Sequence, residues 1–387
     1  MNKEMRYSSP EIMEIIGAEL KRRRLQLAIT LEEFECGCSV SYHSKIENGK
    51  IIPKYTILRE LCEKSGITEV ELEALITLDD KISSIIENLF WEKDLEISKI
   101  YETVCMFDNY KSNLIKMIYE INYLHWDKVE KYSNSIYIIR GNLKENDFYL
   151  YTYLLMRISN HKKDYPEVYS LYKQMKNCKN EFLLALATKE MFKAVCYFGI
   201  ENPVYLYDEF NKRYISMLNY STQDMYELLI ETLIKMDYDL PDMILKHVKK
   251  ELKLKYYLIK KDTLNIDLYI KENRTTTLEK LMIYTAKKDY AKAEKMYYKL
   301  EFNKMNAKDI IIANYCDILN RGNNEELADF IIDTALDYAK HTNDGQLFKV
   351  LLHKLSDISF TVGKYKTVAA MNLVYFNMVN KCNLCML

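Results

Sequence analysis

Glycine and proline are scarce in this sequence, which has 9 Gly and 5 Pro among 387 residues. An architecture of strands joined by tight turns needs more of both, so it is disfavoured. The nearest two glycines, Gly37 and Gly49, are twelve residues apart. This spacing excludes a Walker phosphate loop and the glycine fingerprint of dinucleotide-binding proteins. His-Glu-x-x-His and Gly-x-Ser-x-Gly are missing too, and we predict neither an enzyme nor a cofactor.

Disulfides, metal sites and membrane spans also lack support. The 9 cysteines are odd in number and irregularly spaced, as in a cytosolic protein with reduced thiols. Cys382-x-x-Cys385 and Cys36-x-Cys38 have no second Cys or His pair placed to complete a four-ligand zinc site. No window approaches 18 uncharged apolar residues, so no membrane span is expected. We predict a cytoplasmic protein that binds no metal and no membrane.

The residues that are abundant favour helices. Leu, Ile, Lys, Glu, Tyr and Met dominate, with 49% hydrophobic and 29% charged residues, which indicates an all-α protein with an ample core. The formal net charge is −1, so the chain as a whole gives no reason to expect nucleic acid binding. A contact with DNA would need a local basic patch, and we assign one to Lys21-Arg22-Arg23-Arg24.

Five short helices are expected in the first part of the chain. Apolar residues at helical spacing predict a helix over residues 11–27. Thr30 and Ser39 are placed to cap a second and a third helix, and the third ends at Asn48-Gly49. Pro53 opens a fourth helix over residues 55–64, and Thr68 begins a fifth.

This layout and the run SKIENGKIIP at residues 44–53 resemble the phage-repressor (XRE) helix-turn-helix family. The resemblance implies that the third helix faces the major groove of double-stranded DNA and that flanking residues meet phosphates. The implied base-facing residues are Ser39, Val40, Ser41, Tyr42 and Lys45. The implied phosphate contacts are Arg24, Thr30, Asn48, Lys50 and Lys54.

Two departures from the family pattern affect the second helix. Leu31 stands where the family often has Gln, which removes one polar contact. Residues 30–39 are also about two residues shorter than usual. We expect either a tighter turn or a second helix without its last turn. A helix-turn-helix that serves protein contacts or dimerisation only is the alternative.

The rest of the chain shows a weak internal repeat of about 40 residues. Each copy has a polar turn, an aromatic residue, and a small or β-branched residue three positions later. In the clearest copies the aromatic residues are Trp126, Tyr165, Tyr290 and Tyr365, and the residues three positions later are Val129, Val168, Ala293 and Val368. The pattern predicts a right-handed tetratricopeptide-like α-solenoid of about seven helix pairs. We predict a DNA-binding domain over residues 1–78, a helical connector over 79–105, and a sensor and dimerisation domain over 106–387.

A helix-turn-helix followed by such repeats resembles the Gram-positive quorum-sensing regulators grouped as Rap, Rgg, NprR, PlcR and PrgX, including clostridial regulators of sporulation and toxins. The resemblance implies a homodimeric transcription regulator controlled by a short signalling peptide on the concave face of the repeats. The implied peptide contacts are Asn122, Tyr153, Arg157, Tyr226, Tyr284, Asn314 and Asp317. The alternative is a Rap-like protein whose repeats bind a response regulator or another protein.

Overall fold

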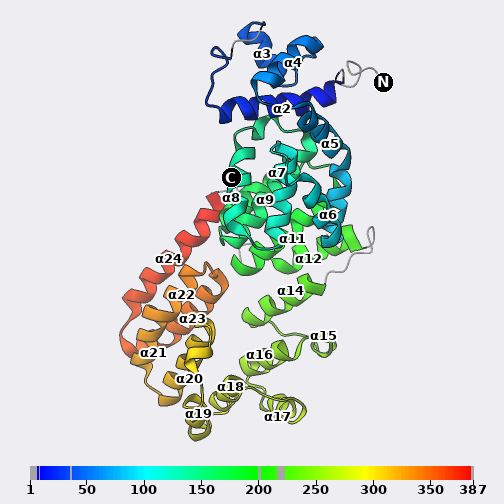
Figure 1. The fold of residues 1–387 in the computed structure, drawn as a ribbon. Helices are drawn as coiled ribbons and strands as arrows, with labels where there is room; N and C mark the ends of the chain where they lie inside the picture. Colours follow the sequence, from blue (N-terminus) through cyan, green and yellow to red (C-terminus); the bar gives the residue numbers. More distant parts are fainter. Residues whose placement is uncertain (1–6, 8, 35–36, 199–201, 216–222, 385–387) are drawn as a thin grey trace. The chain divides into compact units, whose positions relative to one another are not determined.

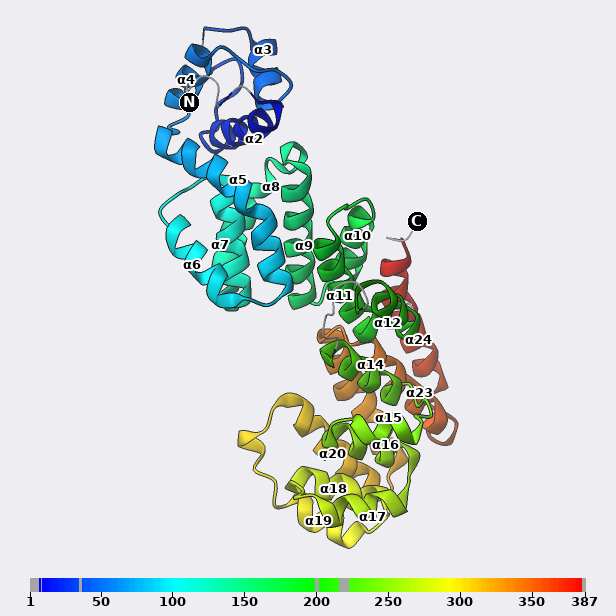
Figure 2. The ribbon, with the colours of Figure 1, turned by 90° about the vertical axis from the view of Figure 1, so that its right-hand side faces the viewer.

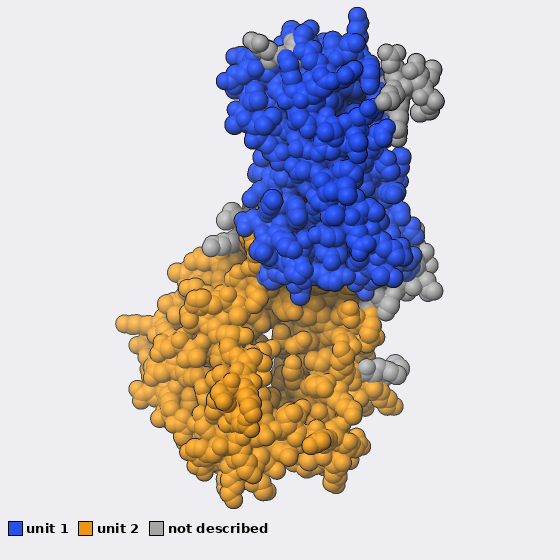
Figure 3. Space-filling view, in the orientation of Figure 1, with its two compact units in different colours: residues 1–161, 171–188 blue, residues 162–170, 189–387 orange. Residues whose placement is uncertain are grey.

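The computed structural model describes residues 7, 9–34, 37–198, 202–215 and 223–384. All regular elements in these ranges are helical, which confirms the prediction of an all-α protein (Figures 1 and 2). The chain divides into two compact units, which Figure 3 colours separately. Unit 1 comprises Met1–His161 and Leu171–Thr188, and unit 2 comprises Lys162–Ser170 and Lys189–Leu387.

Unit 1 begins with four helices that match four of the five predicted at the N-terminal end. They are α2 (Pro10–Gln26), α3 (Val40–Glu47), α4 (Tyr55–Lys64) and α5 (Glu69–Phe90). Ser39 caps α3 by accepting a hydrogen bond from the amide of Tyr42, and Thr68 forms a full capping box with Glu71 at the start of α5. α5 runs through residue 78, where we placed a domain boundary.

The predicted second helix is not formed in the described residues. Thr30 and Glu33 make the reciprocal contacts of a capping box, with the Thr30 amide donating to Glu33 at 2.8 Å. Residues 31–33 nevertheless form a turn, and the backbone does not continue as a helix through Phe34. The prediction that Thr30 caps a helix is therefore wrong. The short connection to Ser39 leaves little room for a second helical turn, and Cys36 of the Cys36-x-Cys38 pair lies outside the described residues.

The remaining helices of unit 1 pack below α2 and α5. α7 packs on α5, α6 and α8, and α9 packs on α5 and α7. α10 and α11 contribute residues to both units. The elements are α6 (Asp94–Val104), α7 (Tyr110–Asn122), α8 (Trp126–Tyr137), η1 (Arg140–Asn142), α9 (Glu145–His161), α10 (Tyr165–Met175) and α11 (Glu181–Phe198).

Unit 2 continues as a series of short helices with successive small cores. Four hydrophobic clusters follow one another along the chain, the first from Ile230 to Leu252 and the last from Ile318 to Val368. Each is built mainly by helices that are neighbours in sequence. The elements are α12 (Pro203–Phe210), η2 (Asn211–Ile215), α14 (Gln223–Lys235), α15 (Asp242–His247), α16 (Lys250–Lys260), α17 (Thr263–Glu272), α18 (Thr277–Ala286), α19 (Tyr290–Tyr297), η3 (Phe302–Lys304), α20 (Ala307–Arg321), α21 (Asn324–Phe330), η4 (Ile331–Ala335), α22 (Leu336–His341), α23 (Gly345–Val362) and α24 (Tyr365–Leu384).

The predicted repeat corresponds to one recurring link between helices. Its aromatic residues are the first residues of α8, α10, α19 and α24. Two positions before each aromatic stands a residue with positive φ, namely Leu124, Lys163, Lys288 and Gly363. The residues three positions after the aromatics, Val129, Val168, Ala293 and Val368, are all buried. A left-handed residue ends one helix and lets the next fold back at once.

Candidate nucleic-acid interface

The position of α3 depends on a close approach to α2 at Gly17. A Cβ atom on Gly17 would lie 2.4 Å from the carbonyl oxygen of Ile46 and 2.9 Å from that of Glu47. Gly49, with φ +64°, ends the turn after α3, and a Cβ there would lie 2.7 Å from the Cα of Glu14. Because both contacts are with backbone atoms, only glycine fits at either position without movement of a helix.

Most of the predicted base-facing residues are exposed on α3. Ser39, Val40, Ser41 and Lys45 are exposed, and Tyr42 is half-buried. Their neighbours Ile46 and His43 are buried and hold the opposite face of the helix against the domain. Figures 1 and 2 show α3 and α4 on the far side of α2 from α7 and α9, so these helices do not cover α3.

Three lysines lie in and just beyond α3. Lys45, Lys50 and Lys54 are exposed, and none of them forms an ion pair with the described part of the chain. Thr30 and Asn48 are also exposed. Asn48 is already bonded: its amide donates to the Ser44 carbonyl at 2.7 Å and its oxygen accepts from Asn142 at 2.7 Å. Within the described part of this surface, these three lysines are therefore cations that an anionic partner can reach.

Arg24 lies inside the domain and does not face the solvent. Its guanidinium donates to both carboxylate oxygens of Glu47, at 2.7 and 2.9 Å, and to the Ile29 carbonyl at 2.8 Å. Nε2 of His43 is 3.2 Å from the same carboxylate. Burial raises the pKa of Glu47, but hydrogen bonds from His43 and Arg24 outweigh it and leave the pKa below its ordinary value. Arg24 thus positions α3, and we no longer assign it a phosphate contact.

The predicted basic patch at residues 21–24 is not a surface patch. Successive helical residues are turned by about 100°, so four in a row point to different sides. Arg22 is completely buried, and Lys21 donates to Asn142 at 2.6 Å. The sequence suggested a cluster of free cations because several of the partners, namely Glu47, Glu71, Asp108 and Asn142, lie far away in the chain.

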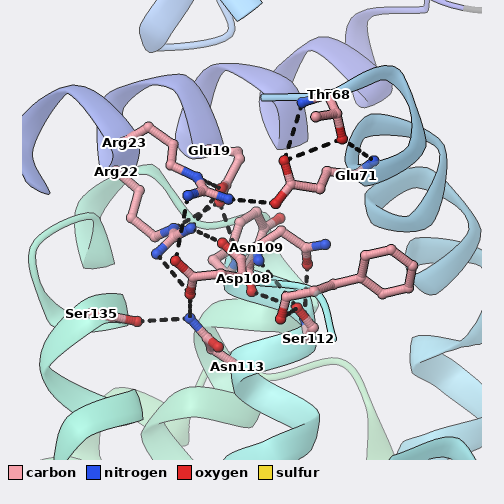
Figure 4. Close-up of polar contacts among 12 residues, drawn as sticks. Glu19, Arg22, Arg23, Thr68, Glu71, Asp108, Asn109, Ser112, Asn113 and Ser135 are labelled. Carbon is pink, nitrogen blue, oxygen red and sulfur yellow. Dashed lines mark hydrogen bonds and ion pairs between the residues drawn. The ribbon is translucent and has the colours of Figure 1, made fainter. Parts of the chain in front are cut away.

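Arg22 and Arg23 instead join α2 to the first turn of α7 (Figure 4). Arg22 donates to the buried Glu19 at 2.7 and 2.8 Å and also to the backbone carbonyl of Asp108. Arg23 lies between Glu19 at 3.1 Å and Glu71 at 2.7 Å. Glu19 accepts a further bond from the amide of Tyr110 at 3.0 Å, at the N-terminus of α7. We call Glu19, Arg22, Arg23, Glu71, Asp108 and Tyr110 together the α2–α7 junction.

A second buried ionic network follows the α2–α7 junction. Lys111, fully buried on α7, donates to Asp147 at 2.6 Å and to Asp79 at 2.8 Å. Lys144 also reaches Asp79, at 3.0 Å, and the Tyr110 hydroxyl donates to Asp147 at 2.9 Å. The network ties α5, α7 and α9 together, so the first helices of unit 1 and the helices that follow form one connected unit.

The structure separates the predicted peptide contacts into two groups. Asn122, Tyr153 and Arg157 belong to unit 1, where Arg157 donates to Asn122 at 2.6 Å and Tyr153 is buried. The others belong to unit 2: Tyr226 lies on α14, Tyr284 on α18, and Asn314 and Asp317 on α20. Asn314 accepts from Tyr297 at 2.9 Å, and Asp317 pairs with Arg321 at 3.1 Å.

Unit 2 contains a cavity that the sequence does not predict. Its volume is about 760 Å³, and residues of α16, α18, α20 and α23 line it. The wall includes Met282, Ile312, Tyr315 and Leu351, and none of the predicted peptide contacts belongs to it. No signal in the sequence identifies it, because its walls lie up to about a hundred residues apart in the chain.

Comparison with known proteins supports the N-terminal part. A family model described as a helix-turn-helix domain matches residues 15–75. No curated protein and no solved structure matches the chain. Among the described residues, no helix has the length and apolar character to cross a membrane, and no cluster of His, Cys, Asp and Glu is suited to hold a metal ion. The helix-turn-helix domain indicates a DNA-binding transcription regulator rather than an enzyme.

Proposed function

We propose that this chain regulates transcription by reading double-stranded DNA with the exposed face of α3, under the control of a short peptide. The observation that carries the first part is the exposure of Ser39, Val40, Ser41 and Lys45 along one capped helix of a helix-turn-helix domain. Short polar side chains and a lysine are suited to base edges in the major groove, and Tyr42 lies at the margin of this face.

Phosphate contacts come from the free lysines beyond α3. Lys50 and Lys54 are exposed and have no ion pair with the described residues, so the displacement of counterions from DNA is not opposed by an internal carboxylate. Thr30 adds a neutral donor at the margin of the same surface, whereas the side-chain amide of Asn48 donates to the Ser44 carbonyl within the domain.

The test is DNA binding by the full chain, with sites selected from random duplexes and affinity measured against salt concentration. We expect Lys45→Ala and Ser41→Ala to weaken binding to the selected site by about 5- to 150-fold. Lys50→Ala with Lys54→Ala should weaken all sequences and reduce the salt slope by about 0.9 for each lost contact. Lys99→Ala on α6, an exposed lysine outside the interface, is the matched control. If the full chain binds no duplex, or if the variants bind like the control, the proposal that α3 recognises DNA is wrong.

Control by a short signalling peptide is supported by the resemblance to the quorum-sensing regulators and by the recurring helix pairs. Six of the predicted residues remain the proposed contacts, namely Asn122, Arg157, Tyr226, Tyr284, Asn314 and Asp317. Tyr153 is withdrawn, because its side chain is buried inside unit 1. The probe is a library of seven-residue peptides, read out by the change in DNA affinity. Because the contacts fall into two groups, Arg157→Ala and Asp317→Ala should be tested separately. A response unchanged in both variants would contradict these sites.

We also propose that the chain acts as a homodimer through α24. Tyr365, Leu373 and Phe376 are 56, 60 and 58% exposed on this helix, so it offers several large apolar side chains to a partner. Leu373→Glu with Phe376→Glu should convert dimer to monomer in sedimentation. If the wild-type chain is monomeric and binds a response regulator in place of DNA, the Rap-like alternative is correct.

A further inference from the structure

The cavity in unit 2 has a wall that is almost entirely apolar. Aliphatic side chains of α16, α18, α20 and α23 supply most of it, including Leu258, Met282, Ile312 and Leu351. The neutral polar residues are few, and burial raises the pKa of the Cys316 thiol to about 11, so this part of the wall stays uncharged at neutral pH. Its volume of about 760 Å³ is in the range of sites that bind small organic molecules.

The charged residues of the lining all have the same sign. Lys261, Lys288 and Lys354 line the cavity, and no Asp or Glu does. In the described part of the chain none of these three lysines forms an ion pair. The preceding residues behave differently, since Lys260 pairs with Asp237 and Asp239, and Lys287 pairs with Asp267.

The positive charge lies toward the solvent side of the lining. Lys261 and Lys288 are exposed and Lys354 is half-buried, whereas Thr285, Cys316 and Ala335 of the same lining are buried. Lys261 caps the end of α16, and Lys288 follows the end of α18, both with left-handed backbone. A ligand that matches this arrangement has an anionic group at the open side and an apolar body inside.

We infer that this cavity binds an amphipathic carboxylate, a medium-chain fatty acid, with its carboxylate among Lys261, Lys288 and Lys354 and its aliphatic chain against the apolar wall. An unbranched chain suits a wall that offers few hydrogen-bonding groups, and the lysines supply the only charges in the lining. This site is distinct from the proposed peptide contacts, none of which lines it, and from the DNA interface in unit 1.

The test is calorimetric titration of the full chain with octanoate, decanoate and dodecanoate below their micelle concentrations. Each added methylene that is buried should tighten binding, by up to about fourfold. Decanol and decylammonium carry the same chain without the negative charge and should bind at least tenfold more weakly than decanoate. Equal binding of decanol and decanoate would overturn the role of the lysines, and no binding of any fatty acid would overturn the site.

Variants separate the two halves of the site. Lys261→Ala with Lys288→Ala should weaken decanoate by at least tenfold and leave decanol unchanged. Val350→Trp should weaken both ligands, because Val350 lines the cavity yet is 43% exposed, so the larger side chain can be tolerated by the fold. Lys349→Ala, its exposed neighbour outside the lining, is the control, and the melting temperature of each variant checks folding. Displacement of decanoate by a seven-residue peptide, with peptide binding much tighter than any fatty acid, would contradict the proposal.

Discussion

Arg24 and Glu47 form a buried, two-pronged ion pair that joins α2 to the end of α3, with N–O distances of 2.7 and 2.9 Å. Both side chains are less than a tenth exposed. The pair therefore fixes the helix that carries the proposed base contacts, through a residue that does not itself face the DNA.

Arg24→Ala should destabilise unit 1 by about 3–5 kcal/mol, because it leaves the buried Glu47 without its main partner. Replacing both residues, Arg24→Met with Glu47→Met, should recover much of this loss. Urea unfolding measures the free energies, and Lys45→Ala serves as a control that should leave stability unchanged. If Arg24→Ala unfolds like the wild type and alters only the salt dependence of DNA binding, Arg24 is a phosphate contact after all.

The same pair makes unit 1 sensitive to acid. The pKa of Glu47 is lower in the folded chain than in the unfolded one, so the unfolded state binds the proton more readily. The stabilisation is therefore fully present above the ordinary Glu pKa of about 4.3 and is lost as the pH falls through the lower folded value. Melting temperatures from pH 7 to 3 should fall less steeply in Glu47→Gln than in wild type. A Glu32→Gln control, at an exposed position, should follow the wild-type curve.

Gly17→Ala should separate α2 from α3. The added Cβ would meet the backbone oxygens of Ile46 and Glu47, and overpacking of this kind costs about 1–3 kcal/mol. We expect lower stability and a loss of DNA affinity from one methyl group. Gly141→Ala is the matched control, since nothing lies within 4 Å of its Cβ position. Identical DNA affinity of the two variants would show that the α2–α3 distance does not govern recognition.

Arg22→Met should loosen the α2–α7 junction. Glu19 would keep Arg23 and the Tyr110 amide but lose two hydrogen bonds in a buried position, with an expected cost of about 3–5 kcal/mol. Hydrogen exchange should accelerate in both α2 and the first turn of α7. Arg59→Met, at an exposed ion pair on α4, should change neither. Faster exchange in α2 alone would mean that the two helices are not coupled.

Local signals predicted the N-terminal helices well. Ser39, Thr68 and Gly49 act within a few residues of their own position, and each performs the capping or terminating role that its sequence context indicates. The aromatic repeat also gave the starts of four helices correctly.

Features that depend on distant partners were not predictable in the same way. Arg22 and Arg23 form ion pairs with Glu71 and Asp108, which are distant in the chain. The sequence of residues 21–24 alone cannot predict that these carboxylates lie beside them. The missing second helix reflects chain length between Thr30 and Ser39 rather than a poor cap. The cavity forms because α16 and α23 line it together, and no local sequence pattern predicts that these two helices come close in space.

The α2–α7 junction restricts how the proposed DNA reader can move. A head on a flexible tether would adjust freely to the spacing of two half-sites. Here the carboxylate of Glu19 accepts a hydrogen bond from the first amide of α7. The two helices α2 and α7 are therefore expected to move together as one rigid part. Because buried ion pairs also tie α7 to α9, the proposed adjustment of a dimer to operator length would come from bending beyond α9, and a mutation there would change operator preference without touching a base.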